Sequence, residues 1–349
     1  MGRDKRNLYY KDLHQQAYEK LKSMQAFGES KKQAMIDGTE KDRIFSFSTY
    51  KTYRKHVEYF VRWIKKEHPE CTTLRKAQKY ANEWLESRVQ TIGEDGRPLS
   101  AWTIHVEAAA INKLYGISKE DPERFISPQR KREDIRRSRL ETERDRHFSE
   151  AGNRELVDFC RATGCRRNVL EKLEGRDLWS REKMKDEIFM YAYPEELGEL
   201  TEKEQKHLDV MRDALENFPE QDYFIHHRQD KNGRYRFAPI IGPHKAEVIE
   251  RMQNTPSHGR VWQHVSSAAD IHSYRADYAT AIYRSFARPI ESIPWERARS
   301  NGRKFQKDLY ICRRDEKGKK LDRRAMLKAS KALGHNRISV VADNYIRGI

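Results

Sequence analysis

The sequence predicts a mainly α-helical protein with a small β-sheet, in which an all-helical domain precedes an α+β domain. Three observations support this fold class. Apolar residues recur every three or four positions through residues 45–120, as on the buried faces of helices. The segment 223–241 (YFIHHRQDKNGRYRFAPII) predicts two strands around a tight turn at Asn232-Gly233. Helical spacing returns near residues 273–283 and at 323–333.

The composition favours a folded protein whose partner is a polyanion. The 349 residues include 70 Lys and Arg against 54 Asp and Glu, which gives a formal net charge of +16, and 10% are aromatic. That length predicts two or three domains with cores of their own, and the aromatic content argues against a disordered chain. Because Lys and Arg bound along a duplex release condensed counterions, the charge favours double-stranded DNA over an acidic small molecule.

The apolar segments and the cysteines indicate a cytoplasmic protein. No run approaches eighteen uncharged apolar residues, so no membrane contact is expected. The first ten residues, MGRDKRNLYY, lack the apolar region of a secretion signal. Cys160 and Cys165 form a C-x4-C without a second pair, which does not predict a zinc site. We expect these two, Cys71 and Cys312 to be reduced thiols, and we expect neither a metal nor a cofactor.

The N-terminal part divides into a helical segment over residues 1–44 and a helical domain over 45–120. Three helices are expected in the domain. Ser48-Thr49 can cap the first, and Ser100 can cap the third, which Gly116 closes.

A basic linker over residues 121–147 leads to the α+β domain at 148–349. The stretch 130–146 holds eight basic residues with five acids among them. A solvated linker and a linker that follows DNA are about equally favoured, because the acids dilute the positive field. The candidate DNA-binding residues are Arg130, Lys131, Arg132, Arg136 and Arg137.

Six polar residues of the α+β domain are candidate catalytic residues. Each alone has an ordinary explanation, such as a surface arginine, a solvated turn lysine, a buried histidine or a packing tyrosine. In chain order they are Arg166 after Gly164, Lys231 at the hairpin turn, His272 and Arg275 on one helix face, His335 after Gly334, and Tyr345 ten residues later.

The order and wording of these residues resemble the tyrosine recombinase family of phage and mobile-element integrases. The sequence has TGCR beside the family's T-G-x-R, RFAPI beside R-x-x-P-hydrophobic, and then HSYR and LGHNR. Lys231 stands five residues before Arg236, as the hairpin lysine of the family does before its arginine. The resemblance covers the C-terminal half and implies a catalytic domain over 148–349. More weakly, it implies that 45–120 is a helical core DNA-binding domain.

The resemblance implies that DNA strands are cleaved and rejoined through a 3′-phosphotyrosyl intermediate. Tyr345 would attack phosphorus, and Lys231 would protonate the departing 5′-oxygen. Because the covalent bond conserves the energy of the diester, rejoining would need neither ATP nor metal. The sequence has no P-loop and no convincing carboxylate cluster for two Mg²⁺ ions, which agrees with this.

The remaining candidates would act on the phosphate or on the proton of the nucleophile. Arg166 and Arg275 would bond the non-bridging oxygens, since a guanidinium stays protonated at any working pH. His335 would donate another hydrogen bond to the same phosphate. His272 is suited to proton handling at the nucleophile because the ordinary histidine pKa lies near 6.5.

The sequence departs from the family pattern in three respects. The position three residues after Arg166, often a carboxylate in the family, is Val169, and nothing in the sequence shows that the nearby Glu171 replaces it. The segments 180–219 and 289–324 are long insertions, the second of which is either a solvated loop or an added contact to DNA or a subunit. Only four residues follow Tyr345, which leaves little to pass to a neighbouring subunit.

As a recombinase, the protein would bind DNA attachment sites as a homo-tetramer in the synaptic complex, and be a monomer or dimer when free. A bacterial, nucleoid-associated location and an accessory directionality factor fit this picture. The insertions favour an integrase of a phage or conjugative element, although integration, excision and resolution share one active site. The alternatives are a type IB topoisomerase-like enzyme and a non-catalytic DNA-binding protein of the same fold.

Overall fold

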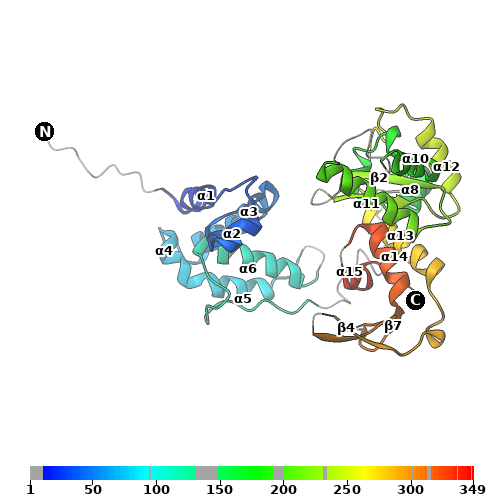
Figure 1. Ribbon diagram of the computed structural model, residues 1–349. Helices are drawn as coiled ribbons and strands as arrows, with labels where there is room; N and C mark the ends of the chain where they lie inside the picture. The colour runs from blue at the N-terminus through cyan, green and yellow to red at the C-terminus, as the bar shows by residue number, and fades with distance from the viewer. Residues whose placement is uncertain are drawn as a thin grey trace. The chain divides into compact units, whose positions relative to one another are not determined.

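The computed structural model divides the chain into two compact units, Met1–Asp134 and Ile135–Ile349, which Figure 1 colours from blue to cyan and from green to red. The boundary falls inside the expected linker 121–147. Within the described residues, no helix combines the length and the apolar surface needed to cross a bilayer. The structure describes residues 11–93, 96–130, 148–191, 200–230, 234–300, 302–312, 316–335, 337–346 and 348–349.

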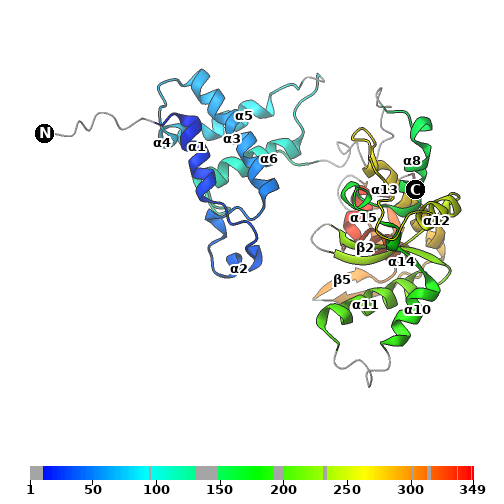
Figure 2. The ribbon, with the colours of Figure 1, turned by 90° about the horizontal axis from the view of Figure 1, so that it is seen from above.

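The described part of the N-terminal unit is built from helices joined by turns and loops (Figure 2). The elements are α1 (Leu13–Ser23), α2 (Lys31–Ile36), η2 (Glu40–Asp42), α3 (Phe47–Glu67), α4 (Leu74–Ala77), η3 (Gln78–Tyr80), α5 (Ala81–Val89) and α6 (Ala101–Tyr115).

One hydrophobic core holds the N-terminal unit together and continues across residue 44. Leu13 and Leu21 of α1 are buried in the same cluster as Phe60 of α3 and Ile111 of α6. The segment 1–44 therefore shares its core with 45–120, because the apolar face of α1 has α3 to pack against.

The helix ends of this unit follow side-chain capping. Ser100 caps α6 as predicted, with its hydroxyl accepting a hydrogen bond from the Thr103 amide at 3.0 Å, and Gly116 ends α6 at φ +68°. The prediction of Ser48-Thr49 as the cap of α3 is wrong. Ser46 has the extended backbone that a cap requires, and its hydroxyl accepts from the Thr49 amide at 3.1 Å.

The C-terminal unit is an α+β arrangement with three small antiparallel sheets, ordered β1-β2-β3, β4-β5 and β6-β7 among the described residues. Its elements begin with η4 (Ala151–Asn153), α8 (Arg154–Thr163), α9 (Arg167–Leu170), η5 (Gly175–Asp177), β1 (Leu178–Ser180), α10 (Arg181–Met190), α11 (Glu202–Asn217), β2 (Tyr223–Asp230) and β3 (Arg234–Pro239). They continue with α12 (Lys245–Gln253), α13 (Ile271–Phe286), η6 (Ile290–Ser292), β4 (Arg297–Ser300), β5 (Arg303–Gln306), β6 (Leu309–Ile311), β7 (Lys320–Asp322), α14 (Arg323–Leu333) and α15 (Ile338–Asn344).

The predicted hairpin forms the middle of the unit, with a core on each of its faces. Strands β2 and β3 are antiparallel, and Ile225 pairs with Ala238. Because side chains alternate along a strand, Phe224 joins the core of α11, α13 and α14, whereas Ile225 joins the core of α8, α9 and α12. The sheet thus separates two cores, and the C-terminal ends of α8 and α14 both contact Arg275 of α13.

The two expected insertions are ordered where the structure describes them. The segment 180–219 contains α10 and α11, which pack on each other; α11 also packs on β3 of the hairpin, and α10 on β1. The segment 289–324 contains η6, the β4–β5 and β6–β7 sheets and the start of α14. In Figure 1 these two sheets lie at the α15 end of the unit.

Candidate active site

A fully buried arginine, Arg275, lies where two helices end. Arg275 is 1% exposed, and its Nη1 and Nη2 atoms donate to the backbone carbonyls of Gly164 and Leu333. These carbonyls belong to the ends of α8 and α14, where unsatisfied carbonyls carry partial negative charge. Two helix C-termini therefore stabilise one buried guanidinium.

The glycine of TGCR is required by this packing. Gly164 ends α8 in the left-handed conformation at φ +58°, and a Cβ at that position would clash with the ring of Tyr278 on α13. This close approach brings the carbonyl end of α8 to Arg275, and Arg166 follows as the N-cap of α9.

The glycine of LGHNR has the same role at the end of α14. Gly334 adopts φ +68°, and a Cβ there would clash with the Arg236 side chain. Arg236 donates from Nη1 to the Ala332 carbonyl at 2.8 Å. The chain then leaves α14 with the His335 amide bonded to the Ser330 carbonyl at 2.8 Å.

Three candidate residues surround the aromatic ring of Tyr345. The ring centroid lies 5.2 Å from that of His335 and 6.4 Å from that of His272, and Arg275 Cζ lies 5.7 Å from it. Tyr345 stands at the end of α15, is 5% exposed, and accepts a bond at its carbonyl from the Thr280 hydroxyl at 3.1 Å. Helices α13, α14 and α15 thus bring together residues from distant parts of the sequence.

Arg166 joins this group through a buried carboxylate that the sequence analysis did not identify. Asp230 at the end of β2 has a fully buried side chain and is ion-paired to Arg166. The same carboxylate Oδ2 accepts from Arg236 Nη2 at 2.9 Å. Its position is not the one that strict strand alternation predicts, because the register shifts between His227 and Asp230. The shift turns Asp230 to the face of His227 and Arg236.

The positive charges of the site act on one another's pKa values. Burial lowers the pKa of Arg236 to about 10, with a further lowering by Arg275. Burial also lowers the pKa of Arg275, and Arg166 adds to this effect while Tyr345 opposes it. His227 is fully buried beside these arginines, and burial followed by their charge holds its pKa well below the ordinary value. The group is a buried, cationic cluster whose charge is suited to an anion.

The structure shows where Val169 lies, the position at which the sequence departs from the family pattern. Val169 is buried in the core of α8 and α12, and Glu171 is exposed at the end of α9. The carboxylate beside Arg166 comes from Asp230 instead. The sequence gives little indication of this ion pair. Arg236 belongs to the R-x-x-P pattern, and Asp230 is distinguished only by standing next to Lys231.

Several candidate residues fall elsewhere. Lys231 lies outside the described residues, as do Lys131, Arg132, Arg136 and Arg137. Arg130 is described, and its guanidinium lies over the ring of Trp102 with Cζ 5.3 Å from the centroid. The four cysteines are buried and free, and within the described ranges no three His, Cys, Asp or Glu side chains converge as metal ligands.

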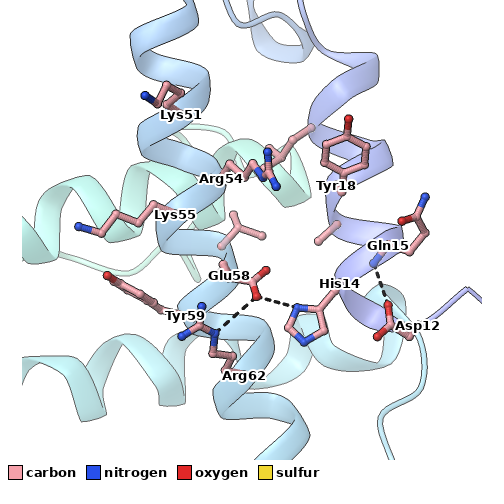
Figure 3. A pocket seen from close by; sticks show the side chains of 13 residues that line it. Asp12, His14, Gln15, Tyr18, Lys51, Arg54, Lys55, Glu58, Tyr59 and Arg62 are labelled. Carbon is pink, nitrogen blue, oxygen red and sulfur yellow. Dashed lines mark hydrogen bonds and ion pairs between the residues drawn. The ribbon is translucent and has the colours of Figure 1, made fainter.

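A second cationic surface lies on the N-terminal unit, in the groove between α1 and α3 (Figure 3). Exposed Lys51, Arg54 and Lys55 project from one side of α3, and Arg54 Cζ lies 5.2 Å from the Tyr18 ring centroid. Farther along α3, Arg62 pairs with Glu58 at 3.4 Å. Basic side chains interleaved with aromatic rings are typical of surfaces that bind nucleic acid.

Comparisons with known proteins do not assign this geometry to a family. No family model matches the sequence, and no curated protein matches it.

Proposed function

We propose that the protein is a site-specific DNA recombinase that cleaves and rejoins strands through a phosphotyrosyl intermediate, as the resemblance to tyrosine recombinases implies. The observation that carries the proposal is the gathering of Arg275, His272 and His335 around Tyr345, with centroid and Cζ distances of 5.2 to 6.4 Å. A packing tyrosine has no need of two histidines and a buried arginine at its ring.

The proposed reaction follows from the chemistry of these groups. The Tyr345 oxygen attacks phosphorus, forming a phosphotyrosyl bond as the bond to the 5′-oxygen breaks. His272 accepts the phenol proton, and Lys231 supplies a proton to the departing oxygen. Attack by a 5′-hydroxyl reverses both steps and rejoins the strand.

Charge neutralisation supports the transition state of this reaction. The N–H groups of Arg275 and Arg166 can hydrogen-bond the non-bridging oxygens, and His335 adds a donor. The desolvated setting strengthens each of these interactions relative to water. We further propose that the cationic groove between α1 and α3 contacts the duplex, and that recombination takes place in a homo-tetramer.

The test is covalent capture from a pool of nicked duplexes with randomised central sequence. We expect a denaturant-resistant protein–DNA adduct with the natural chain and none with Tyr345→Phe. Tyr223→Phe, which changes a half-buried tyrosine of β2, is the matched control and should retain the adduct.

The outcome separates the competing functions. An undiminished adduct with Tyr345→Phe, or none from duplexes that the protein binds, contradicts the catalytic assignment and leaves a DNA-binding protein. Recombinant joints between two captured sites support a recombinase, whereas relaxation of supercoils without joints supports a topoisomerase-like enzyme.

A further inference from the structure

We propose that the β4–β5 hairpin of the insertion between Arg275 and His335 is a DNA-binding arm, and that its exposed basic face contacts phosphates of the duplex. The inference rests on the proposed function only in taking DNA as the substrate. It assigns a role to a segment outside the site described above.

Strand register places three basic residues, Arg297, Arg299 and Lys304, on one face of the hairpin. Arg299 pairs with Lys304 and Arg297 with Gln306, and directly paired residues of an antiparallel ladder share a face. Arg297, Arg299 and Lys304 are all exposed. The sequence of the hairpin from 297 to 306, RARSNGRKFQ, contains no acid.

These three cations differ from their neighbours in lacking acidic partners. Nearby, Lys307 pairs with Glu296 at 3.2 Å, and Arg324 pairs with Asp308 at 2.9 Å. Among the described residues, no carboxylate lies within ion-pair distance of Arg297, Arg299 or Lys304. Because like charges repel, a row of cations without ion-pair partners is disfavoured on its own and is suited to an anionic partner.

The base of the hairpin is fixed to the catalytic unit. Phe305 packs under Arg323 of α14, whose Cζ lies 4.6 Å from the ring centroid. The adjoining β6–β7 sheet buries Leu309 and Leu321, and Arg288 holds Asp322 at 2.8 Å. A two-stranded ribbon with a fixed base is an element that the DNA major groove can admit.

The basic face also adjoins the helix that leads to Tyr345. Arg297 and Lys304 line a groove together with Ser339 and Asp343 of α15. A duplex held by the hairpin would therefore lie against the same part of the unit as the proposed nucleophile. A second copy of the chain is a poorer occupant, since a two-fold contact would bring identical cations together.

The test compares two variants of the full chain with equal loss of charge. The arm variant carries Arg297→Gln, Arg299→Gln and Lys304→Gln. The control variant carries Lys307→Gln, Lys319→Gln and Arg324→Gln, which remove cations of the same insertion that already have acidic partners. Binding to a mixed-sequence 30-base-pair duplex is measured by fluorescence anisotropy between 50 and 200 mM salt.

The slope of log affinity against log salt is negative. If all three side chains contact phosphates, its magnitude should fall by about 2.7 in the arm variant. Over that salt range the wild-type affinity would then drop about 40-fold more than that of the arm variant. The control variant should lose less than about one unit of slope. Both should keep the wild-type thermal midpoint, because the changed side chains are on the surface.

Each outcome has a definite meaning. Equal slopes for the two variants would contradict the proposal that the β4–β5 hairpin binds DNA. Absence of duplex binding by the natural chain would contradict the proposed function itself. If the arm variant keeps its slope but sediments as a smaller species without DNA, the hairpin is a contact between copies and the inference is wrong. Should the triple variant not fold, Lys304→Gln alone must lower the slope by about 0.9.

Discussion

Asp230→Asn should destabilise the C-terminal unit by removing the carboxylate that joins Arg166 and Arg236. The Asp230 side chain is fully buried and ion-paired to both guanidiniums. Asparagine keeps the shape and one oxygen acceptor. The substitution therefore changes the charge of the cluster with little effect on its packing.

The expected cost follows from burial and from the number of partners. Breaking a buried ion pair by neutralising one member costs about 3–5 kcal/mol, because the remaining charge stays desolvated. The retained amide oxygen recovers part of this, since a neutral acceptor forms a bond about half as strong as a charged one. We therefore expect a loss of about 3 kcal/mol in the free energy of unfolding. Asp213→Asn, which alters a half-exposed carboxylate paired with Lys331, should cost less than about 1 kcal/mol.

Native-state hydrogen exchange on peptides from β2 and α13 measures this loss separately from the N-terminal unit. Inorganic phosphate provides a second readout, because an anion can take the place of the lost charge. At 20 mM phosphate, a dissociation constant of about 2 mM would return about 1.4 kcal/mol to the variant. The natural protein, whose cationic cluster already holds a carboxylate, should gain less.

The proposed role of Asp230 is refuted if the free energies of unfolding of Asp230→Asn and the natural protein differ by less than about 1 kcal/mol. It is also refuted if phosphate stabilises the two proteins equally. Either result would mean that Asp230 does not neutralise the charge of Arg166 and Arg236.

The remaining predictions concern packing, pH and DNA contacts. Gly164→Ala should lower the free energy of unfolding by about 3 kcal/mol, because left-handed backbone strain adds to a clash with Tyr278. Gly116→Ala, at a similar φ in open space, should cost only the strain of about 1–2 kcal/mol. Urea unfolding measures both losses. Burial lowers the pKa of His226 to about 3 from 6.5, so the unfolded chain takes up a proton that the folded one refuses, and stability should fall as pH drops below 6.5. Between pH 7.5 and 5.5 that loss is about 1.4 kcal/mol for this histidine, and His226→Phe should remove it from the pH profile of unfolding; an unchanged profile would contradict the assignment. Replacing Lys51, Arg54 and Lys55 with Gln should lower the salt slope of duplex binding by about 2.7. Arg62→Gln, whose guanidinium already pairs with Glu58, should change the slope by clearly less than the roughly 0.9 expected of one phosphate contact. A triple variant that changes the slope no more than Arg62→Gln does would argue against the α3 contact.

Local signals in the sequence were sufficient for several elements. The Asn232-Gly233 turn in the segment 223–241 predicts the hairpin of β2 and β3, and Gly116 ends α6 as predicted. Each of these signals depends on residues a few positions apart. The spacing of Leu74, Ala77, Ala81, Trp84 and Leu85 predicts a single helix. The structure instead has α4, the 3-10 turn η3 and α5 there, because helical spacing of apolar residues continues through such a turn.

The candidate site divides in the same way. The positive charge, and the order in which Arg166, Arg275, His335 and Tyr345 occur, can be read from the sequence. Which groups contact one another depends on the fold, because Asp230 faces Arg166 through a register shift in β2 that strand alternation does not predict. The burial of Arg275 between the carbonyl ends of α8 and α14 likewise depends on contacts between residues 111 and 58 positions apart in the chain. Such long-range contacts are fixed by how the two cores pack on the sheet, which no local pattern encodes.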